Sequence, residues 1–399
     1  MAIERIIVRE IFDSRGEPTI EVAVTESGVT SSAAVPSGKS RGMREAVVLS
    51  ASDAQAAAAG PLQREIIGHS FDSIQALDRK LIALDGTKNK SVLGGNLMLG
   101  VSVAHARNLA TTHAKPLWRI IHNEFFSDQP TASTPPLIFA NLVNGGAHAR
   151  NTLAFQEYLV IARTTVSVTQ TVRDVVRIYH TLGDALRERF HIKAIPLGDE
   201  EGYSLDFKSN MEPLTLMTEC IARCGLADRF SLGLDVAASS FYANGRYTFE
   251  KTTRTTAELV ETYGRFFGSV PALVSIEDPF DENDAQGFKE LYERFPQKLI
   301  VGDDLTVTDP LRIEEFARGK CISGVIVKPN QIGTLTESCM ALRAAHDAGV
   351  KTIVSHRSGE TEDTLIIHLA RASGAEGVKI GAPLNERIVK FDELIRLYE

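Results

Sequence analysis

Short apolar runs recur along the C-terminal two thirds of the chain, and each ends on a charged or polar side chain. The residues at six such ends are Asp235, Glu277, Asp303, Lys328, His356 and Lys379, at intervals of 23 to 42 residues. One strand, one helix and two loops of a (β/α)8 barrel take roughly 25–35 residues, and such barrels carry their chemistry at the C-terminal ends of the strands. Any one run fits an ordinary core strand, but six in phase predict an eight-stranded TIM-like barrel.

The N-terminal part has a different pattern. The segments IERIIVREIF, TIEVAVTE and VTSSAAV are rich in β-branched residues and are separated by turn-forming residues, which predicts an antiparallel sheet. Three helical patterns follow, at residues 53–67, from a capping candidate at Asp72, and at residues 96–113.

A polar loop with three prolines, at residues 127–136, separates the two patterns. We therefore predict an α/β fold of two domains, with a small N-terminal domain at residues 1–130 and the barrel with the active site at residues 131–399. This division suits a chain of 399 residues, because such a barrel takes about 250.

With 43% hydrophobic and 24% charged residues, the chain has the composition of a soluble globular protein. The net charge of −8 argues against a general nucleic-acid partner. No apolar run reaches the ~20 residues that cross a bilayer, and Glu4, Arg5 and Arg9 interrupt the N-terminal apolar run, so we expect neither a membrane partner nor a secretory signal. The four cysteines lack zinc-site spacing, and we expect them reduced in a cytoplasmic protein.

Three of the strand ends are carboxylates, at Asp235, Glu277 and Asp303. One such acid alone fits a solvated strand end. Three at one barrel mouth repel one another unless a cation lies between them, and oxygen-only ligands suit Mg²⁺. The pattern therefore predicts a magnesium site.

Two of the strand ends at the same barrel mouth carry lysines, Lys328 and Lys379. An ammonium close to a second ammonium and a divalent ion has its charged form disfavoured, so Lys328 is a candidate general base. Lys379 fits a salt-bridge partner equally well. Arg357 and Ser358, next to the strand-end His356, offer donors matched to phosphate oxygens.

These segments resemble the enolase (phosphopyruvate hydratase) family over nearly the whole chain. The similar segments are DSRGEPT at 13–19, VPSGKS at 35–40, LDGTKNKS at 84–91, NLVNGGAHA at 141–149, GDE at 198–200, GLD at 233–235, SIEDPF at 275–280, GDDLTVT at 302–308, KPNQIGTLTES at 328–338, SHRSGETEDT at 355–364 and KIGAP at 379–383. The resemblance implies a small β/α domain before a barrel with a ββαα start, and a dimer.

The resemblance also implies roles at matching positions. Asp235, Glu277 and Asp303 would hold one Mg²⁺, and Ser40 would help to bind a second that arrives with substrate. Lys328 would remove the C2 proton of 2-phosphoglycerate. Glu200, supported by Glu157 beside Gln156, would expel the C3 hydroxyl as water. Lys379 would bind the substrate carboxylate, and His356 would lie near the leaving group. Arg357 and Ser358 would hold the phosphate, and Gln156 would contact the substrate. His148 would come from a second loop that closes over the site.

The chain departs from the family pattern around this site. The loop at residues 37–45 carries three additional cations, Lys39, Arg41 and Arg44, and the loop after NGGAHA carries Arg150. Left unpaired, each cation would attract an anionic ligand by roughly 3 kcal/mol gross at 5 Å, which favours a larger or more anionic substrate. Further departures are Glu201 for a glycine, Pro329 after Lys328, and a segment after KIGAP that is one residue shorter.

Three functions follow. The first is an enolase that dehydrates 2-phosphoglycerate to phosphoenolpyruvate. The second keeps the metal site and Lys328 but takes a larger phosphorylated or phosphonylated carboxylate, as carboxyphosphonoenolpyruvate synthase does in phosphonate natural-product pathways. The third, a non-catalytic scaffold, predicts loss of the metal or base positions, and none is lost. For a homodimer or higher homo-oligomer, the resemblance places Arg15 against the partner's C-terminal acid, Glu399.

Overall fold

The N-terminal hairpins form the antiparallel sheet that the sequence predicts. In the computed structural model, which describes residues 2–39 and 42–399, the strands are β1 (Ile3–Phe12), β2 (Pro18–Glu26) and β3 (Val29–Val35), in that order. Gly16 and Gly28, at φ of 75° and 80°, adopt the left-handed conformation that the two turns require.

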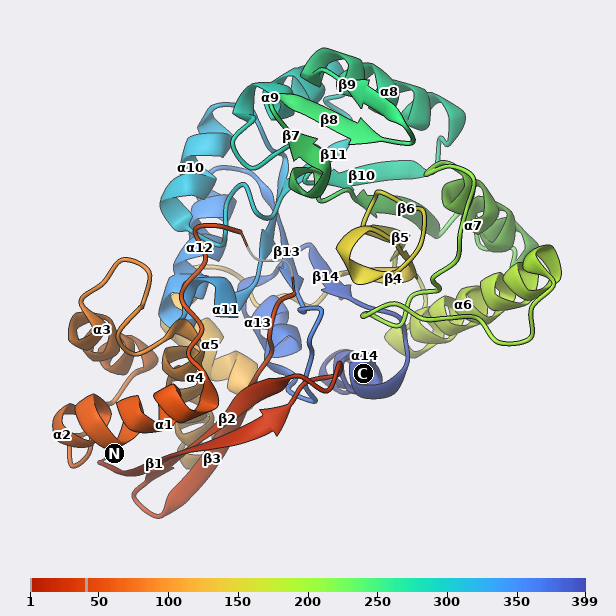
Figure 1. Cartoon of the computed structure of the whole chain (residues 1–399). Helices are drawn as coiled ribbons and strands as arrows, with labels where there is room; N and C mark the ends of the chain where they lie inside the picture. The colour runs from red at the N-terminus through yellow and green to blue at the C-terminus, as the bar shows by residue number, and fades with distance from the viewer. Residues whose placement is uncertain (1, 40–41) are drawn as a thin grey trace.

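Helices cover this sheet on the side of the barrel (Figure 1). They are α1 (Ala51–Ala57), the π-turn η1 (Ala58–Leu62), α2 (Gln63–Glu65), α3 (Ile74–Asp85), α4 (Gly95–Thr112) and α5 (Leu117–Phe125). α4 packs on β2 and β3, and it also contacts α11 and α12 of the barrel. Gly100 permits this packing, because a Cβ there would lie 2.4 Å from Val22 Cγ2.

Three details differ from the prediction. The helix at residues 53–67 is interrupted by the π-turn, because Pro61 lacks the N–H that a continuous helix needs. Ser73, not Asp72, caps α3, since its hydroxyl accepts the N–H of Ala76 at 3.1 Å. The third difference is α5, which no sequence pattern predicted.

The second part is a closed barrel of eight strands (Figure 1). They are β4 (Leu137–Asn144), β5 (Glu157–Ala162), β6 (Phe230–Asp235), β10 (Leu273–Glu277), β11 (Leu299–Gly302), β12 (Gly324–Val327), β13 (Lys351–Ser355) and β14 (Gly377–Ile380). β5 runs antiparallel to both of its neighbours and the other pairs are parallel. The predicted fold class is confirmed, including the ββαα start.

The helices around the barrel follow the strands in chain order. They are α6 (Val168–Phe190), α7 (Glu212–Arg223), α8 (Thr256–Ser269), α9 (Ala285–Arg294), α10 (Pro310–Arg318), α11 (Pro329–Ile332), α12 (Leu335–Asp347), α13 (Leu365–Ser373) and α14 (Ile388–Tyr398). A small sheet of β7 (Tyr242–Ala243), β8 (Arg246–Phe249) and β9 (Thr252–Arg254) lies at the top of Figure 1. This insertion explains the long interval between Asp235 and Glu277.

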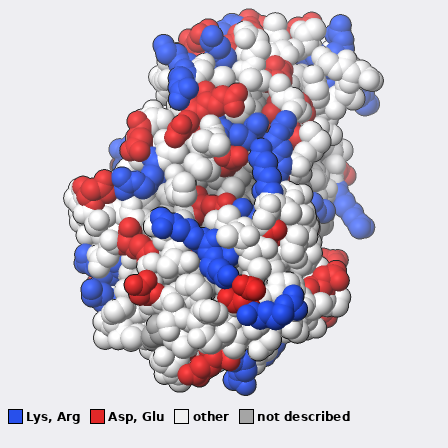
Figure 2. Space-filling view, turned by 90° about the vertical axis from the view of Figure 1, so that its left-hand side faces the viewer, with Lys and Arg blue, Asp and Glu red and all other residues white. Residues whose placement is uncertain are grey.

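The loop at residues 126–136, without helix or strand, connects α5 to β4. The boundary that we place after residue 130 falls in this loop and stays a prediction. Within the described chain, all four cysteines are buried and unpaired, and no helix is long and apolar enough to span a membrane. Charges of both signs are interspersed over the face in Figure 2.

One buried acid joins the two parts of the chain. Asp78, on α3, is fully buried, and its carboxylate accepts the N–H of Thr336 on α12 at 2.9 Å. Burial raises the pKa of Asp78 to about 6. The folded pKa therefore exceeds that of the unfolded chain, so the contribution of Asp78 to stability is full below about pH 4 and is lost as the pH rises through 6.

We expect Asp78→Asn to increase the free energy of unfolding relative to wild type by about 2 kcal/mol at pH 8 and to have little effect at pH 4. Urea unfolding of both chains across this pH range measures the difference. A pH-independent difference would contradict the assignment.

Candidate active site

The three predicted metal ligands meet at one mouth of the barrel. Asp235 and Glu277 are the last residues of β6 and β10 and lie in register, and Asp303 directly follows β11. All three are buried, at no more than 6% exposed. Their strands are parallel neighbours, so the C-terminal ends place the carboxylates side by side.

Two lysine ammonium groups lie among these carboxylates. Lys379 Nζ is 3.1 Å from Asp235 Oδ2, 2.8 Å from Glu277 Oε2 and 3.2 Å from Glu157 Oε2. Its side chain leaves β14 one residue before the end of that strand. Lys328, after β12, donates to Asp303 Oδ2.

Neighbouring cations disfavour the Lys328 ammonium as expected, but they do not decide the direction of its pKa shift. Burial lowers the pKa of Lys328, and Arg357 and Lys379 lower it further, but contact with the Asp303 carboxylate outweighs them and the pKa lies above its usual value. At Glu277, burial and then the Asp235 charge raise the pKa well above its usual value.

The donor set fits a divalent cation. Acids outnumber ammonium groups at the mouth: the buried acids are Asp235, Glu277, Asp303, Glu157 and Glu200, and the ammonium groups are those of Lys328 and Lys379. Carboxylate oxygens of Asp278, Asp303 and Asp304 also lie within 4.8 Å of one another. Carboxylates supply only oxygen ligands, and a buried excess of them suits a hard cation such as Mg²⁺.

Gln156 lies at 5% exposure next to the metal candidates. Its backbone N–H donates to Asp235 O at 3.0 Å and its side-chain Nε2 donates to Asp235 Oδ2 at 3.4 Å. The structure therefore links Gln156 to a metal candidate, while its predicted substrate contact stays a prediction.

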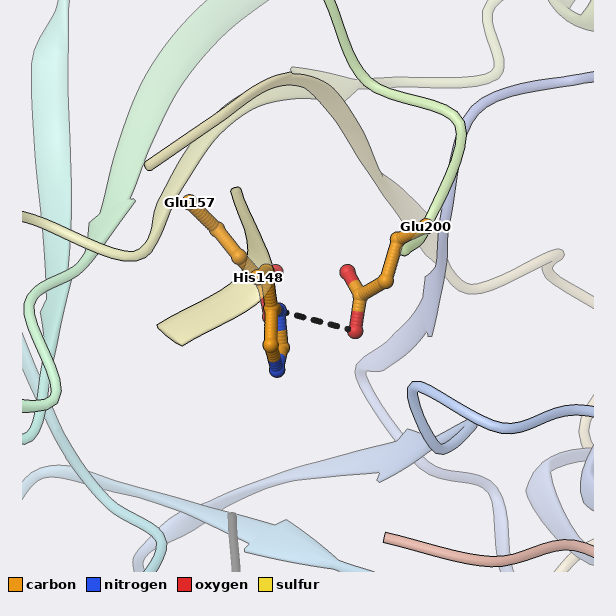
Figure 3. A group of neighbouring side chains, drawn as sticks. All are labelled: His148, Glu157 and Glu200. Carbon is orange, nitrogen blue, oxygen red and sulfur yellow. Dashed lines mark ion pairs between the residues drawn. The ribbon is translucent and has the colours of Figure 1, made fainter. Parts of the chain in front are cut away.

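Two glutamates and a histidine lie close together at the same mouth. Figure 3 shows the carboxylate of Glu200 pointing toward the ring of His148, with Glu157 behind it. His148 Nδ1 lies 3.4 Å from Glu200 Oε1 and 3.8 Å from Glu157 Oε1. Read without the family resemblance, His148 is a surface residue, but the short helix η2 (Gly146–His148) places it at 3% exposure.

The two glutamates differ in proton affinity. Burial and then the Glu200 charge raise the pKa of Glu157 well above its usual value. Burial also raises the pKa of Glu200, but the neighbouring His356, His148 and other basic side chains outweigh it, so that pKa is lowered. The surroundings therefore shift the pKa values of the two glutamates in opposite directions.

His356 and Asn141 complete the surroundings of Glu200. His356 Nε2 lies 3.6 Å from Glu200 Oε2, and burial lowers the pKa of the imidazole well below its usual value. Asn141 Nδ2 donates to the same oxygen at 2.9 Å. The sequence analysis gave Asn141 no role, although it opens the NLVNGGAHA segment.

The predicted phosphate-binding corner is formed by Arg357 and Ser358. The Arg357 guanidinium lies 3.0 Å from Glu45 Oε2 and donates to Asn330 Oδ1 at 2.9 Å. Ser358 Oγ accepts the backbone N–H of Lys39 at 2.9 Å. Glu45, which ends the loop at residues 37–45, had no predicted role. The sequence feature that could have indicated one is an acidic side chain at the end of a basic loop.

Two of the four added cations of the loops are paired within the chain. Lys39 Nζ lies 2.7 Å from Asp199 Oδ2, and Arg44 lies 3.7 Å from Glu282. Acids of neighbouring barrel loops reach these two cations, so neither is left unpaired within the chain. Arg150 is exposed and makes no ion pair with the described residues.

Two predicted site residues, Ser40 and Arg41, lie outside the described residues. Pro329 is the first residue of α11, where a missing N–H leaves no helix bond unmade. The backbone N–H of Lys328 itself donates to Thr308 Oγ1 at 2.9 Å. This hydrogen bond holds the lysine backbone in place next to the proline.

A barrel with an antiparallel second strand, and with acids and lysines gathered at the C-terminal mouth, defines a lyase of the enolase superfamily. The family models described as "Enolase, N-terminal domain" and "Enolase, C-terminal TIM barrel domain" match residues 3–121 and 132–399. The chain belongs to the enolase family. It is 41% identical over 412 aligned residues to a protein named "Enolase" from Acidothermus cellulolyticus, covering 100% of this chain and 94% of that protein.

Proposed function

We propose that this protein catalyses the reversible dehydration of 2-phosphoglycerate to phosphoenolpyruvate with two Mg²⁺ per active site. One observation carries the proposal: Lys328, Glu200, Lys379 and the Arg357–Ser358 pair line the same small cavity at the barrel mouth. A base, an acid, a carboxylate-binding ammonium and a phosphate-binding guanidinium therefore face one volume.

Each residue has a separate task. Asp235, Glu277 and Asp303 would hold one Mg²⁺ and Ser40 would help to hold the second, and the ions would supply Lewis acidity at the substrate carboxylate. Lys328, as the free amine, takes the C2 proton, and the electron pair left on carbon forms the C2–C3 double bond.

The C3 hydroxyl leaves as that bond forms. It takes a proton from Glu200, which Glu157 resupplies, and departs as water. Lys379 binds the substrate carboxylate, and Arg357 with Ser358 binds the phosphate. Incubation with 2-phosphoglycerate and Mg²⁺, followed at the absorbance of phosphoenolpyruvate, tests the proposal, and a rate near background would overturn it.

A second candidate rests on an outer cavity. A volume of about 440 Å³, lined by Lys39, Arg150 and Asp199, adjoins the inner cavity at His148. Such a volume favours a larger phosphorylated or phosphonylated carboxylate, such as the substrates of carboxyphosphonoenolpyruvate synthase. Turnover of phosphoenolpyruvate with a nucleotide-activated phosphonoformate, seen by ³¹P NMR, together with no turnover of 2-phosphoglycerate, would select it.

We expect Arg357→Lys to increase the KM for 2-phosphoglycerate about 100-fold. A lysine loses the two-pronged contact with phosphate, and charge-assisted hydrogen bonds contribute roughly 1.5–3 kcal/mol each. Arg343→Lys, at an exposed pair with Asp128, is the matched control and should leave KM unchanged. A change in KM of less than threefold for Arg357→Lys would place the phosphate elsewhere.

We also propose that the protein is cytoplasmic and assembles as a homodimer or higher homo-oligomer. Within this chain Arg15 is paired with Asp13 at 2.8 Å, and Glu399 accepts the N–H of Thr169 at 3.0 Å. The predicted contact between Arg15 and Glu399 of a second copy would have to add to these contacts or replace them. Light scattering that shows a monomer would overturn the proposal.

A further inference from the structure

We propose that Glu201 and Asn385 are positioning residues that hold the acid loop, residues 198–202, in the geometry that Glu200 needs for hydroxyl loss. This inference rests on the proposed function. Glu201 Oε1 accepts a hydrogen bond from Asn385 Nδ2, and the contact joins the loop to the short helix η4 (Asn385–Arg387).

Glu201 occupies an unfavourable position for its residue type. Its φ of 64° lies in the left-handed region, which costs a non-glycine residue roughly 1–2 kcal/mol. Its carboxylate is also buried, at 8% exposure, and Oε2 has no hydrogen-bond partner within the described chain. A glycine here would avoid both costs, so the side chain is retained for the contact that it makes.

The contact reaches the proposed acid through the backbone. Ala382 N donates to Glu200 O at 3.1 Å, and Arg387 donates to Asp199 O at 3.3 Å. A Cβ at Gly381 would lie 2.9 Å from Glu200 O, so the two segments pack without a gap. The side-chain contact of Glu201 is the third tie between them.

Residues 381–387, which these contacts join to the acid loop, continue from β14, the strand that carries Lys379. Lys379 is assigned to the substrate carboxylate and Glu200 to the leaving hydroxyl. The Glu201–Asn385 contact therefore sets the spacing between the two ends of the reacting carbon skeleton. Misplacement of a catalytic group by about 1 Å can cost on the order of 100-fold in rate.

Two partial reactions separate positioning from general damage. Lys328 removes the C2 proton before Glu200 assists hydroxyl loss, so exchange of the C2 hydrogen in D₂O reports the first step and phosphoenolpyruvate formation reports both. We expect Glu201→Gly and Asn385→Ala to lower kcat for phosphoenolpyruvate about tenfold. The KM and the C2 exchange rate should stay within about twofold of wild type.

Exchanging the donor and the acceptor of the Glu201–Asn385 hydrogen bond should restore turnover. Asn385→Asp alone sets two carboxylates against each other and should lower kcat most. Combined with Glu201→Gln, whose amide can donate to the new carboxylate, it should return kcat to within about threefold of wild type. Lys320→Gly is the matched control, because Lys320 is an exposed non-glycine residue at φ of 55°. It precedes β12, whose far end carries Lys328, and the substitution should change neither reaction.

The outcomes are distinct. Unchanged kcat in Glu201→Gly and Asn385→Ala, or parallel losses of exchange, turnover and melting temperature without rescue, would overturn the positioning role. A wild-type chain that neither exchanges the C2 hydrogen nor forms phosphoenolpyruvate would overturn the proposed function, and this inference with it.

Discussion

Lys328→Met abolishes the exchange of the C2 hydrogen of 2-phosphoglycerate and lowers kcat for phosphoenolpyruvate by about 10⁴-fold. Removal of a general base costs up to roughly 10⁴, and the other amine at the barrel mouth, Lys379, is held by three carboxylates. The methionine has a similar length but cannot accept a proton. Deuterium incorporation by NMR and steady-state kinetics measure the two losses.

The control is a lysine at the opposite end of the barrel. Lys351 begins β13, is exposed, and forms no ion pair with the described residues, so Lys351→Met should retain wild-type rates. Persistent C2 exchange in Lys328→Met would assign proton removal to another residue. That result would not bear on the metal site, so proton removal and Mg²⁺ binding are tested separately.

Glu277→Gln is expected to weaken Mg²⁺ binding at least 100-fold and to reduce turnover to near background. The amide supplies one weaker oxygen donor in place of a charged carboxylate. Without Mg²⁺, the variant should melt at the wild-type temperature or above it, because a buried carboxyl whose ionised form burial and neighbouring acids disfavour is replaced by a neutral amide of similar size, while Lys379 keeps two other acids.

Titration calorimetry with MgCl₂, and melting curves with and without EDTA, test both halves of this expectation. Glu314→Gln, an exposed acid on α10, should bind Mg²⁺ as wild type does. Unchanged Mg²⁺ affinity in Glu277→Gln would move the ion to the neighbouring acids Asp278 and Asp304, whose oxygens also group with Asp303.

The barrel was predictable because its signal is local and repeated. A buried strand needs only a few consecutive apolar residues, and the acid at its end is adjacent in sequence, as at Glu277 after Leu273–Ile276. The same locality made the N-terminal sheet predictable. Short helices such as α5 and the π-turn at Pro61 were missed because their weak local signals compete with tertiary packing.

The partners of the charged site residues could not be predicted. Glu45 and Arg357 are 312 residues apart, and Lys39 and Asp199 are 160 apart. The pairing with Asp199 engages Lys39, a predicted substrate-binding cation, in an intrachain contact. The Glu201–Asn385 contact likewise joins two unrelated departures from the family pattern, which the sequence showed only as separate oddities.

The sequence by itself determined which chemical groups this protein has and at which strand ends they stand, because strand periodicity and chain order are written in consecutive residues. Only the tertiary structure decided which carboxylate meets which cation, and so which pKa values are raised or lowered. That decision depends on distances of 3–4 Å between residues far apart in the chain, where a charge interaction varies steeply with separation and burial.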